Sequence, residues 1–125
     1  MNKPKLLVSI VRMHHISNPS KFRRLKRHAI QSNVSGLVKT GKPGVLVFDG
    51  SPQSIKMFLT HARGLRYLDF HHVATGPMPP NIASRVVSGT PGLHEVEGMN
   101  DIVQAMDVLQ LKDWFRENLG LGGQG

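Results

Sequence analysis

The sequence predicts an α+β fold of the ferredoxin-like class: a split β-α-β (βαββαβ) antiparallel sheet with two helices on one face and a C-terminal helical extension. Short runs rich in β-branched residues alternate with segments whose apolar residues recur at helical spacing. Over residues 5–73 the order is strand, helix, strand, strand, helix, strand, which is the ferredoxin-like order. A chain of 125 residues holds one core of ordinary size. We therefore expect residues 1–125 to form a single domain.

The predicted core begins with a strand at residues 6–13, a short apolar run that contains Val8, Ile10 and Val11. A helix follows from Asn18 and Pro19, because asparagine caps helix starts and proline suits the first turn. Its expected buried stripe comprises Phe22, Leu25, Ala29 and Ile30. Strands at residues 37–39 and 45–48 then flank the turn at residues 41–44.

A second helix is predicted from Ser51 and Pro52 to Gly64. It has the clearest periodicity in the chain, with apolar residues at Ile55, Phe58, Leu59, Ala62 and Leu65. Residues 67–70 alternate in polarity and predict the fourth strand. The predicted core therefore ends near residue 73.

Residues 74–99 are rich in proline and glycine and are expected to form an irregular connection. Helical spacing returns at residues 100–119, where Ile102, Val103, Met106 and Leu109 align. We expect this C-terminal segment to cover the open face of the sheet, with Trp114 and Phe115 in the core.

The charge is uneven along the chain. The net charge is +8, and residues 1–72 hold 13 of the 16 lysines and arginines but two of the eight acidic residues. Such clustering favours polyanionic partners. The chain has no cysteine, which excludes disulfides and thiolate metal sites, and its apolar runs are too short for a membrane span. We expect a nuclear or cytoplasmic protein.

Several segments resemble the C-terminal domain of the spliceosomal small nuclear ribonucleoprotein Prp-three, which also follows the RWD domain in some RWD-domain-containing proteins. They are His14-His15 after the first strand, the basic helix, the turn and strand at residues 41–50, and residues 65–67. The resemblance covers residues 5–72. It implies a ferredoxin-like domain that binds paired small nuclear RNAs during mRNA splicing.

The predicted function is a non-catalytic RNA-binding or ribonucleoprotein-assembly module, with structured small RNA or ribonucleoprotein proteins as partners. The candidate RNA-binding residues are cationic and lie on the first helix and around it: Lys21, Arg23, Arg24, Lys26, Arg27, Lys39, Lys42, Arg63 and Arg66. A solvated basic face is the simpler reading of the helix, and a tight hairpin is the simpler reading of the turn at residues 41–44.

The alternative function is a protein-interaction adaptor that uses the basic face or the apolar C-terminal helix, including an exposed stripe at Trp114 and Phe115. No cofactor or metal is expected. His14-His15 and His71-His72 cannot chelate as neighbours, and the predicted strand order places the two pairs at opposite ends of the sheet. Asp49 and Asp69 pair with no nucleophile, so no catalytic residue is proposed and we expect no enzyme.

Overall fold

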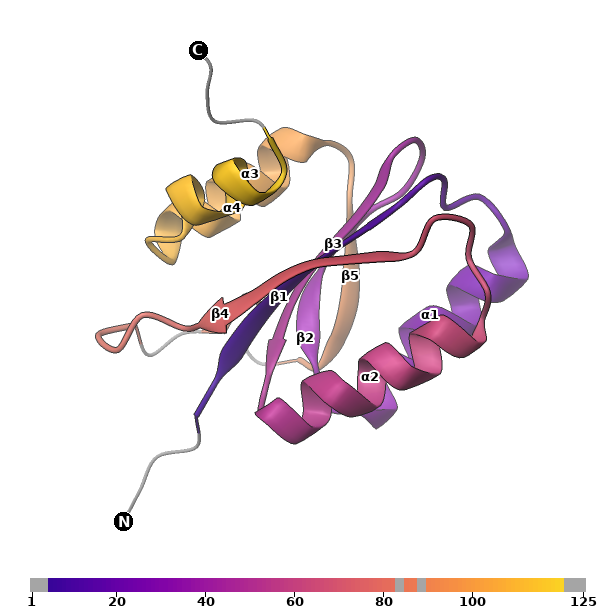
Figure 1. The fold of residues 1–125 in the computed structure, drawn as a ribbon, viewed down its shortest axis with the longest axis horizontal. Helices are drawn as coiled ribbons and strands as arrows, with labels where there is room; N and C mark the ends of the chain where they lie inside the picture. Colours follow the sequence, from indigo (N-terminus) through magenta and orange to yellow (C-terminus); the bar gives the residue numbers. More distant parts are fainter. Residues whose placement is uncertain (1–4, 83–84, 88–89, 121–125) are drawn as a thin grey trace.

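Figure 1 shows a five-stranded sheet with two helices on each side. The computed structural model describes residues 5–82, 85–87 and 90–120. Along the chain the elements are β1 (Leu7–Met13), α1 (Pro19–Gln31), β2 (Ser35–Lys39), β3 (Gly44–Gly50), α2 (Pro52–Gly64), β4 (His71–Pro77), β5 (Gly92–Val96), α3 (Met99–Val108) and α4 (Lys112–Asn118). The strand order is β4-β1-β3-β2-β5, antiparallel except for the β2–β5 pair. The predicted ferredoxin-like class is confirmed.

Both long helices start at the predicted caps. The Asn18 side chain accepts a hydrogen bond from the Lys21 N–H at 3.0 Å, and Ser51 accepts one from the Ser54 N–H at 3.1 Å. Each cap is followed by a proline in the first turn, where its missing N–H breaks no helical hydrogen bond. No helix among the described residues is long and apolar enough to cross a lipid bilayer.

Two apolar layers hold the sheet from opposite sides. Leu25 and Ala29 of α1 and Phe58 and Ala62 of α2 are fully buried on the face that Phe48 shares. The opposite layer joins residues of β1 and β3 to α3 and α4; its buried members include Val8, Ile10, Val45, Val47, Ile102, Met106 and Phe115. The C-terminal segment therefore covers the second face, as predicted. Phe115 is fully buried and Trp114 partly so, which rules out the exposed stripe expected of the adaptor.

The fourth strand was predicted too early. Residues 67–70 form a turn, and β4 instead spans His71–Pro77 and pairs antiparallel with β1. Arg66 and Asp69 flank that turn with left-handed φ angles of 59° and 55°, which an extended strand does not contain. The alternating polarity at residues 67–70 therefore reflects one buried ring, Tyr67, inside a turn.

The predicted connection at residues 74–99 contains a further strand. β5 adds in parallel to β2, beginning at the pair Ser35 and Gly92. The Gly92 N–H donates to the Val34 carbonyl at 2.6 Å, and Gly92 has a φ of 108°, which glycine adopts without strain. A five-residue strand whose partner lies far away in the sequence leaves little local pattern, which explains the error.

Gly36 shows how closely the strands are packed. A β-carbon at this position in β2 would collide with the Val47 carbonyl oxygen and the Phe48 β-carbon. The glycine is thus required by space, and it lies inside the strand.

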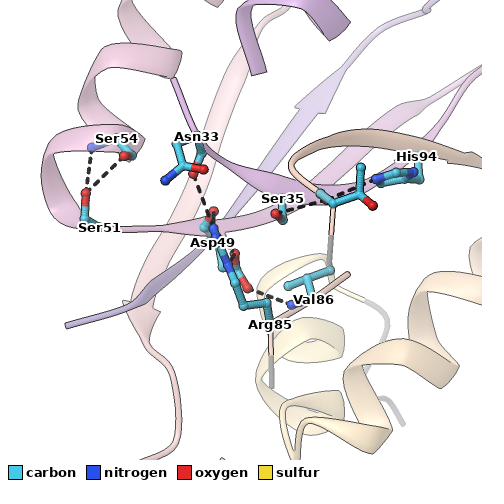
Figure 2. A network of polar contacts seen from close by, with 9 residues as sticks. Asn33, Ser35, Asp49, Ser51, Ser54, Arg85, Val86 and His94 are labelled. Atoms are coloured by element: carbon cyan, nitrogen blue, oxygen red, sulfur yellow. Dashed lines mark hydrogen bonds and ion pairs between the residues drawn. The ribbon is translucent and has the colours of Figure 1, made fainter. Parts of the chain in front are cut away.

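A buried ion pair fastens residues 85–86 to the sheet (Figure 2). The Asp49 side chain on β3 is fully buried and accepts from Arg85 Nε at 2.8 Å and from the Val86 N–H at 2.6 Å. Arg85 Nη2 also donates to the carbonyls of Asp49 at 3.1 Å and Asn33 at 3.3 Å. Burial raises the pKa of Asp49, and these hydrogen bonds and the Arg85 charge act against that rise. The role of the Asp49–Arg85 pair is therefore to hold residues 85–86 against the sheet.

Replacing Arg85 with alanine should lower the free energy of unfolding by about 3 kcal/mol, because the Asp49 carboxylate stays buried without its counter-charge. Urea unfolding followed by circular dichroism measures this loss.

The control is Arg116→Ala, at an exposed position of α4, which should change stability by less than about 0.5 kcal/mol. Equal effects of the two substitutions would contradict the role of the ion pair.

Candidate functional site

A hollow lies at the end of β1, where the β2–β3 turn and the start of β4 meet. It has a volume of about 580 Å³, and we call it the strand-end pocket. Its lining residues come from three segments: Arg12, Met13, His14, Lys42, Pro43, Asp69, Phe70 and His71. The volume lies within the range of small-molecule sites in proteins.

Strand pairing assembles the pocket. Arg12 lies opposite Val45 on β3 and His71 on β4, and paired residues point to the same face of a sheet. Val45 belongs to the layer that α3 and α4 cover, so Arg12 and His71 continue that face beyond the helices. Both of these side chains are exposed. The pocket is thus the uncovered end of an otherwise covered face.

The turn at residues 41–44 forms one wall. Gly41 has a φ of 86°, which favours glycine, and a β-carbon on Gly44 would collide with Ile16. The Lys39 ammonium donates to the carbonyl of Pro43 at 2.9 Å and to that of Thr40 at 3.3 Å. These contacts fix the turn from within, and the Lys42 side chain remains exposed at its tip.

The turn between α2 and β4 forms the opposite wall. The His14 N–H donates to the Leu68 carbonyl at 3.3 Å, which joins the turn to the end of β1. His14 Nδ1 also lies 3.9 Å from the Asp69 carboxylate, and both side chains are largely exposed. Phe70 packs against the first core cluster and provides an apolar surface within the pocket.

The pocket is positively charged. Four of its lining residues are basic, Arg12, His14, Lys42 and His71, against the single carboxylate of Asp69. Over residues 5–82, 85–87 and 90–120 the ion pairs within 4.0 Å are His14–Asp69 and Arg85–Asp49. Arg12 and Lys42 therefore have no acidic partner in the part of the chain that the structure describes.

The nine basic residues predicted as one site are divided by the structure. Lys42 lines the pocket, and the Arg63 guanidinium lies 5.9 Å from the Phe70 ring beside it. Lys39 is held by the turn it supports. The other six lie on α1 or at the end of α2: Lys21, Arg23, Arg24, Lys26, Arg27 and Arg66.

The prediction that the two histidine pairs lie at opposite ends of the sheet is wrong. Because β4 begins at His71, antiparallel pairing with β1 brings His71 next to Arg12, and His14 lines the same pocket. Within the described residues no group of three or more His, Asp or Glu side chains is arranged to hold a metal ion. Sequence reasoning missed Arg12, His14 and His71 as pocket residues because the strand register brings them together.

A second polar feature lies between α1 and α2. The rings of His28 and His61 stack with their centroids 4.7 Å apart and their planes 8° apart. His28 Nδ1 is buried and has no hydrogen-bond partner among the described residues. Burial lowers the pKa of His28, and the neighbouring His61, Arg27 and Arg24 charges lower it further. The interface is therefore suited to neutral imidazole.

The buried Ser9 hydroxyl on β1 lies 2.6 Å from the hydroxyl of Thr75, an exposed residue of β4, and His72 Nε2 lies 2.6 Å from the same Thr75 oxygen. Burial lowers the pKa of His72, as do the charges of Arg63 and His71, while a backbone hydrogen bond at Ala74 acts in the opposite direction. The chain of three side chains holds β4 onto β1.

Comparison with known proteins finds likeness at the level of fold. No family model and no curated protein sequence matches the chain. Among solved structures it is similar to the BLUF protein BlrB in its dark state, with a TM-score of 0.58 and 15% identity over 94% of this chain and 91% of that one. The BlrP1 BLUF structure gives 0.58 and 11% over 99% and 82%. A bacterial light-regulated adenylyl cyclase gives 0.54 and 11% over 92% and 36%.

These findings correct the family and function predictions. The structural neighbours are BLUF domains, so the assignment to the Prp-three and RWD-associated family is wrong, and so are the splicing function and the RNA or ribonucleoprotein partners derived from it. The turn at residues 41–44, the most specific part of that resemblance, is explained by local needs: a left-handed Gly41 and close packing at Gly44. Neither need involves RNA.

The His28–His61 stack predicts a loss of stability in acid. A histidine whose pKa is lowered by folding binds fewer protons in the folded state than in the unfolded state. Its contribution to the free energy of unfolding is therefore complete above the unfolded-state pKa of 6.5, and it declines as the pH falls below that value. Thermal unfolding measured across this range should show a falling midpoint. His28→Gln should flatten the decline, and an unchanged slope in this variant would contradict the assignment.

Proposed function

We propose that the chain is a non-catalytic regulatory domain that binds a small organic anion in the strand-end pocket. The ligand has one phosphate or carboxylate group and one flat apolar group. The observation that supports this most directly is the pocket lining, in which Arg12 and Lys42 have no acidic partner among the described residues and lie beside the apolar surface of Phe70. We place this activity in the cytoplasm.

The chemistry of the lining matches such a ligand. An arginine guanidinium offers paired donors to a carboxylate or phosphate, and a lysine ammonium acts as a point charge. Phe70 and Pro43 offer apolar surface for a ring. Asp69 lies 3.9 Å from His14, and neither Arg12 nor Lys42 forms an ion pair with it, which leaves the guanidinium and the ammonium to the ligand.

The fold relatives support a regulatory role. One of them is a bacterial light-regulated adenylyl cyclase, in which the matching part is 36% of that longer chain. A domain of this fold thus occurs within a longer protein whose catalytic activity is controlled. We propose that this chain is likewise a controlling domain. We infer the signal that it binds from its own pocket residues and not from the relatives.

The residues of this chain do not fit a flavin, the cofactor with which BLUF domains sense light. A flavin needs a slot for three fused rings and hydrogen-bonding groups along its pyrimidine edge. Between the helices and the sheet, the space is filled by fully buried side chains such as Leu25, Leu46 and Phe48. Of the hydroxyls on that face, Ser9 and Thr75 bind each other, while the buried Tyr67 hydroxyl has no partner among the described residues. We therefore propose no light-driven step.

The lining also supports a binding role over a catalytic one. His14 and Asp69 form an imidazole–carboxylate pair, yet the eight lining residues include no hydroxyl or thiol for that pair to activate. The lining residues are thus equipped to hold an anion.

Phenyl phosphate should bind to the folded chain, and Lys42→Gln and Arg12→Gln should each weaken binding about tenfold, since a hydrogen bond to a charged group contributes roughly 1.5 kcal/mol or more. Titration calorimetry gives the affinities, and amide chemical shifts at residues 12–14, 41–44 and 69–71 locate the site.

The matched control is Lys56→Gln, which removes one charge from an exposed position of α2. Two results would overturn the proposal: equal weakening by the control, which indicates general charge attraction, or shifts that map away from the pocket. Phenyltrimethylammonium, a cation of similar size, should not bind.

A further inference from the structure

A second charged surface lies beside the pocket, where the start of α1 meets the end of α2. We call it the helix-end patch and define it by Lys21, Arg24, Arg66 and Leu68, together with Tyr67. In Figure 1 it lies where α2 leads into the chain segment before β4. Arg66 and Leu68 belong to the patch and Asp69 and Phe70 line the pocket, so both adjoin the segment that precedes β4.

Direct contacts hold the patch together. Lys21 Nζ donates to the Arg66 carbonyl at 3.2 Å and lies 5.5 Å from the centroid of the Tyr67 ring. Burial raises the pKa of Tyr67 to about 12, and the charge of Arg24, one turn along α1 from Lys21, acts against that rise. The Lys21 contacts therefore join the start of α1 to the residues that follow α2.

The charge of the patch is not neutralised within the described part of the chain. Neither described ion pair involves Lys21, Arg24 or Arg66. Like charges held close together repel each other, so an acidic partner would lower the free energy of this surface. An acidic partner would stabilise this patch more than it would stabilise scattered cations, because the Lys21 ammonium is held in place by its hydrogen bond to the Arg66 carbonyl.

The backbone of Arg66 is a second reason to assign a role to the patch. Arg66 follows the last residues of α2 and has a φ of 59°, a conformation in which glycine is favoured. An arginine there costs about 1 kcal/mol relative to an unstrained residue. Its N–H donates to the Arg63 carbonyl at 3.1 Å, so the backbone needs no particular side chain.

Leu68 gives the patch an apolar component. Its side chain is 67% exposed, one of the largest exposures among the bulky apolar residues described. An exposed apolar residue two positions after Arg66 suits a protein segment with acidic and apolar side chains. It contributes little to binding of a bare phosphate chain.

We propose that the helix-end patch docks an acidic protein segment, with carboxylates on Lys21, Arg24 and Arg66 and an apolar side chain on Leu68. This surface is separate from the anion site of the pocket. Both surfaces adjoin the segment at residues 66–70, which carries Arg66 and Leu68 of the patch and Asp69 and Phe70 of the pocket.

The test measures binding of a short peptide of alternating glutamate and leucine by fluorescence anisotropy. Arg66→Gly is the informative variant, since glycine suits the left-handed backbone and removes only the side chain. It should weaken binding about tenfold, as expected for loss of a charge-assisted contact, with a thermal midpoint unchanged or raised. Leu68→Ser should also weaken binding, and Lys56→Gln should leave it intact.

Three results would overturn the proposal: no binding of the peptide, full binding by Arg66→Gly, or equal binding of heparin with no effect of Leu68→Ser. The last result would identify a general polyanion surface. Lys42→Gln separates the two sites, because it should weaken phenyl phosphate binding in the pocket and leave peptide binding unchanged.

Discussion

The structure depends on burial of the central strands β1 and β3 from both sides. Val8 and Ile10 face α3 and α4, while Val11 and Met13 face α1 and α2, and all four are buried. Burying a large apolar side chain contributes roughly 1.5 to 3 kcal/mol, so each strand position is assigned to one layer or the other. The two layers fill the space on both faces of these strands with apolar side chains, so the strand-end pocket lies where the strands leave the two layers.

The strand-end pocket follows from that constraint. At Arg12 the register still aligns β1 with β3 and β4, so the backbone is as rigid as in the core, yet α3 and α4 no longer cover the face. A side chain on a rigid strand loses less freedom on binding than one on a loop, which favours a preorganised site. The two neighbouring turns add Lys42 and Phe70 from different parts of the sequence. The same sheet thus provides stability along most of its length and, in the function that we propose, a binding surface at one end.

The sequence predicts features set by near neighbours and misses those set by pairing. The caps at Asn18 and Ser51 and the apolar stripes of both long helices depend on residues within a turn or two, and they appear as expected. The exception among the stripe residues is Ile30, which is 57% exposed beside Gly92 at the start of β5. β5 and the pocket depend on pairs such as Ser35 with Gly92 and Arg12 with His71, and no local pattern encodes these. The basic charge was visible in the sequence, but its division between pocket, turn and helix surface was not.

Helices α1 and α2 end in the same backbone conformation, but a different residue type holds the left-handed position after each of them. This difference separates what the backbone requires from what the side chain does. After α1 the left-handed position is Asn33, a residue type that adopts this conformation readily, with a φ of 59°. After α2 the same conformation falls on Arg66, for which it is unfavourable. Both ends keep their backbone hydrogen bonds, from Asn33 to Ile30 and from Arg66 to Arg63, each at 3.1 Å. Since the backbone hydrogen bond forms equally well without a guanidinium, the strained conformation of Arg66 is consistent with the docking role that we propose for its side chain.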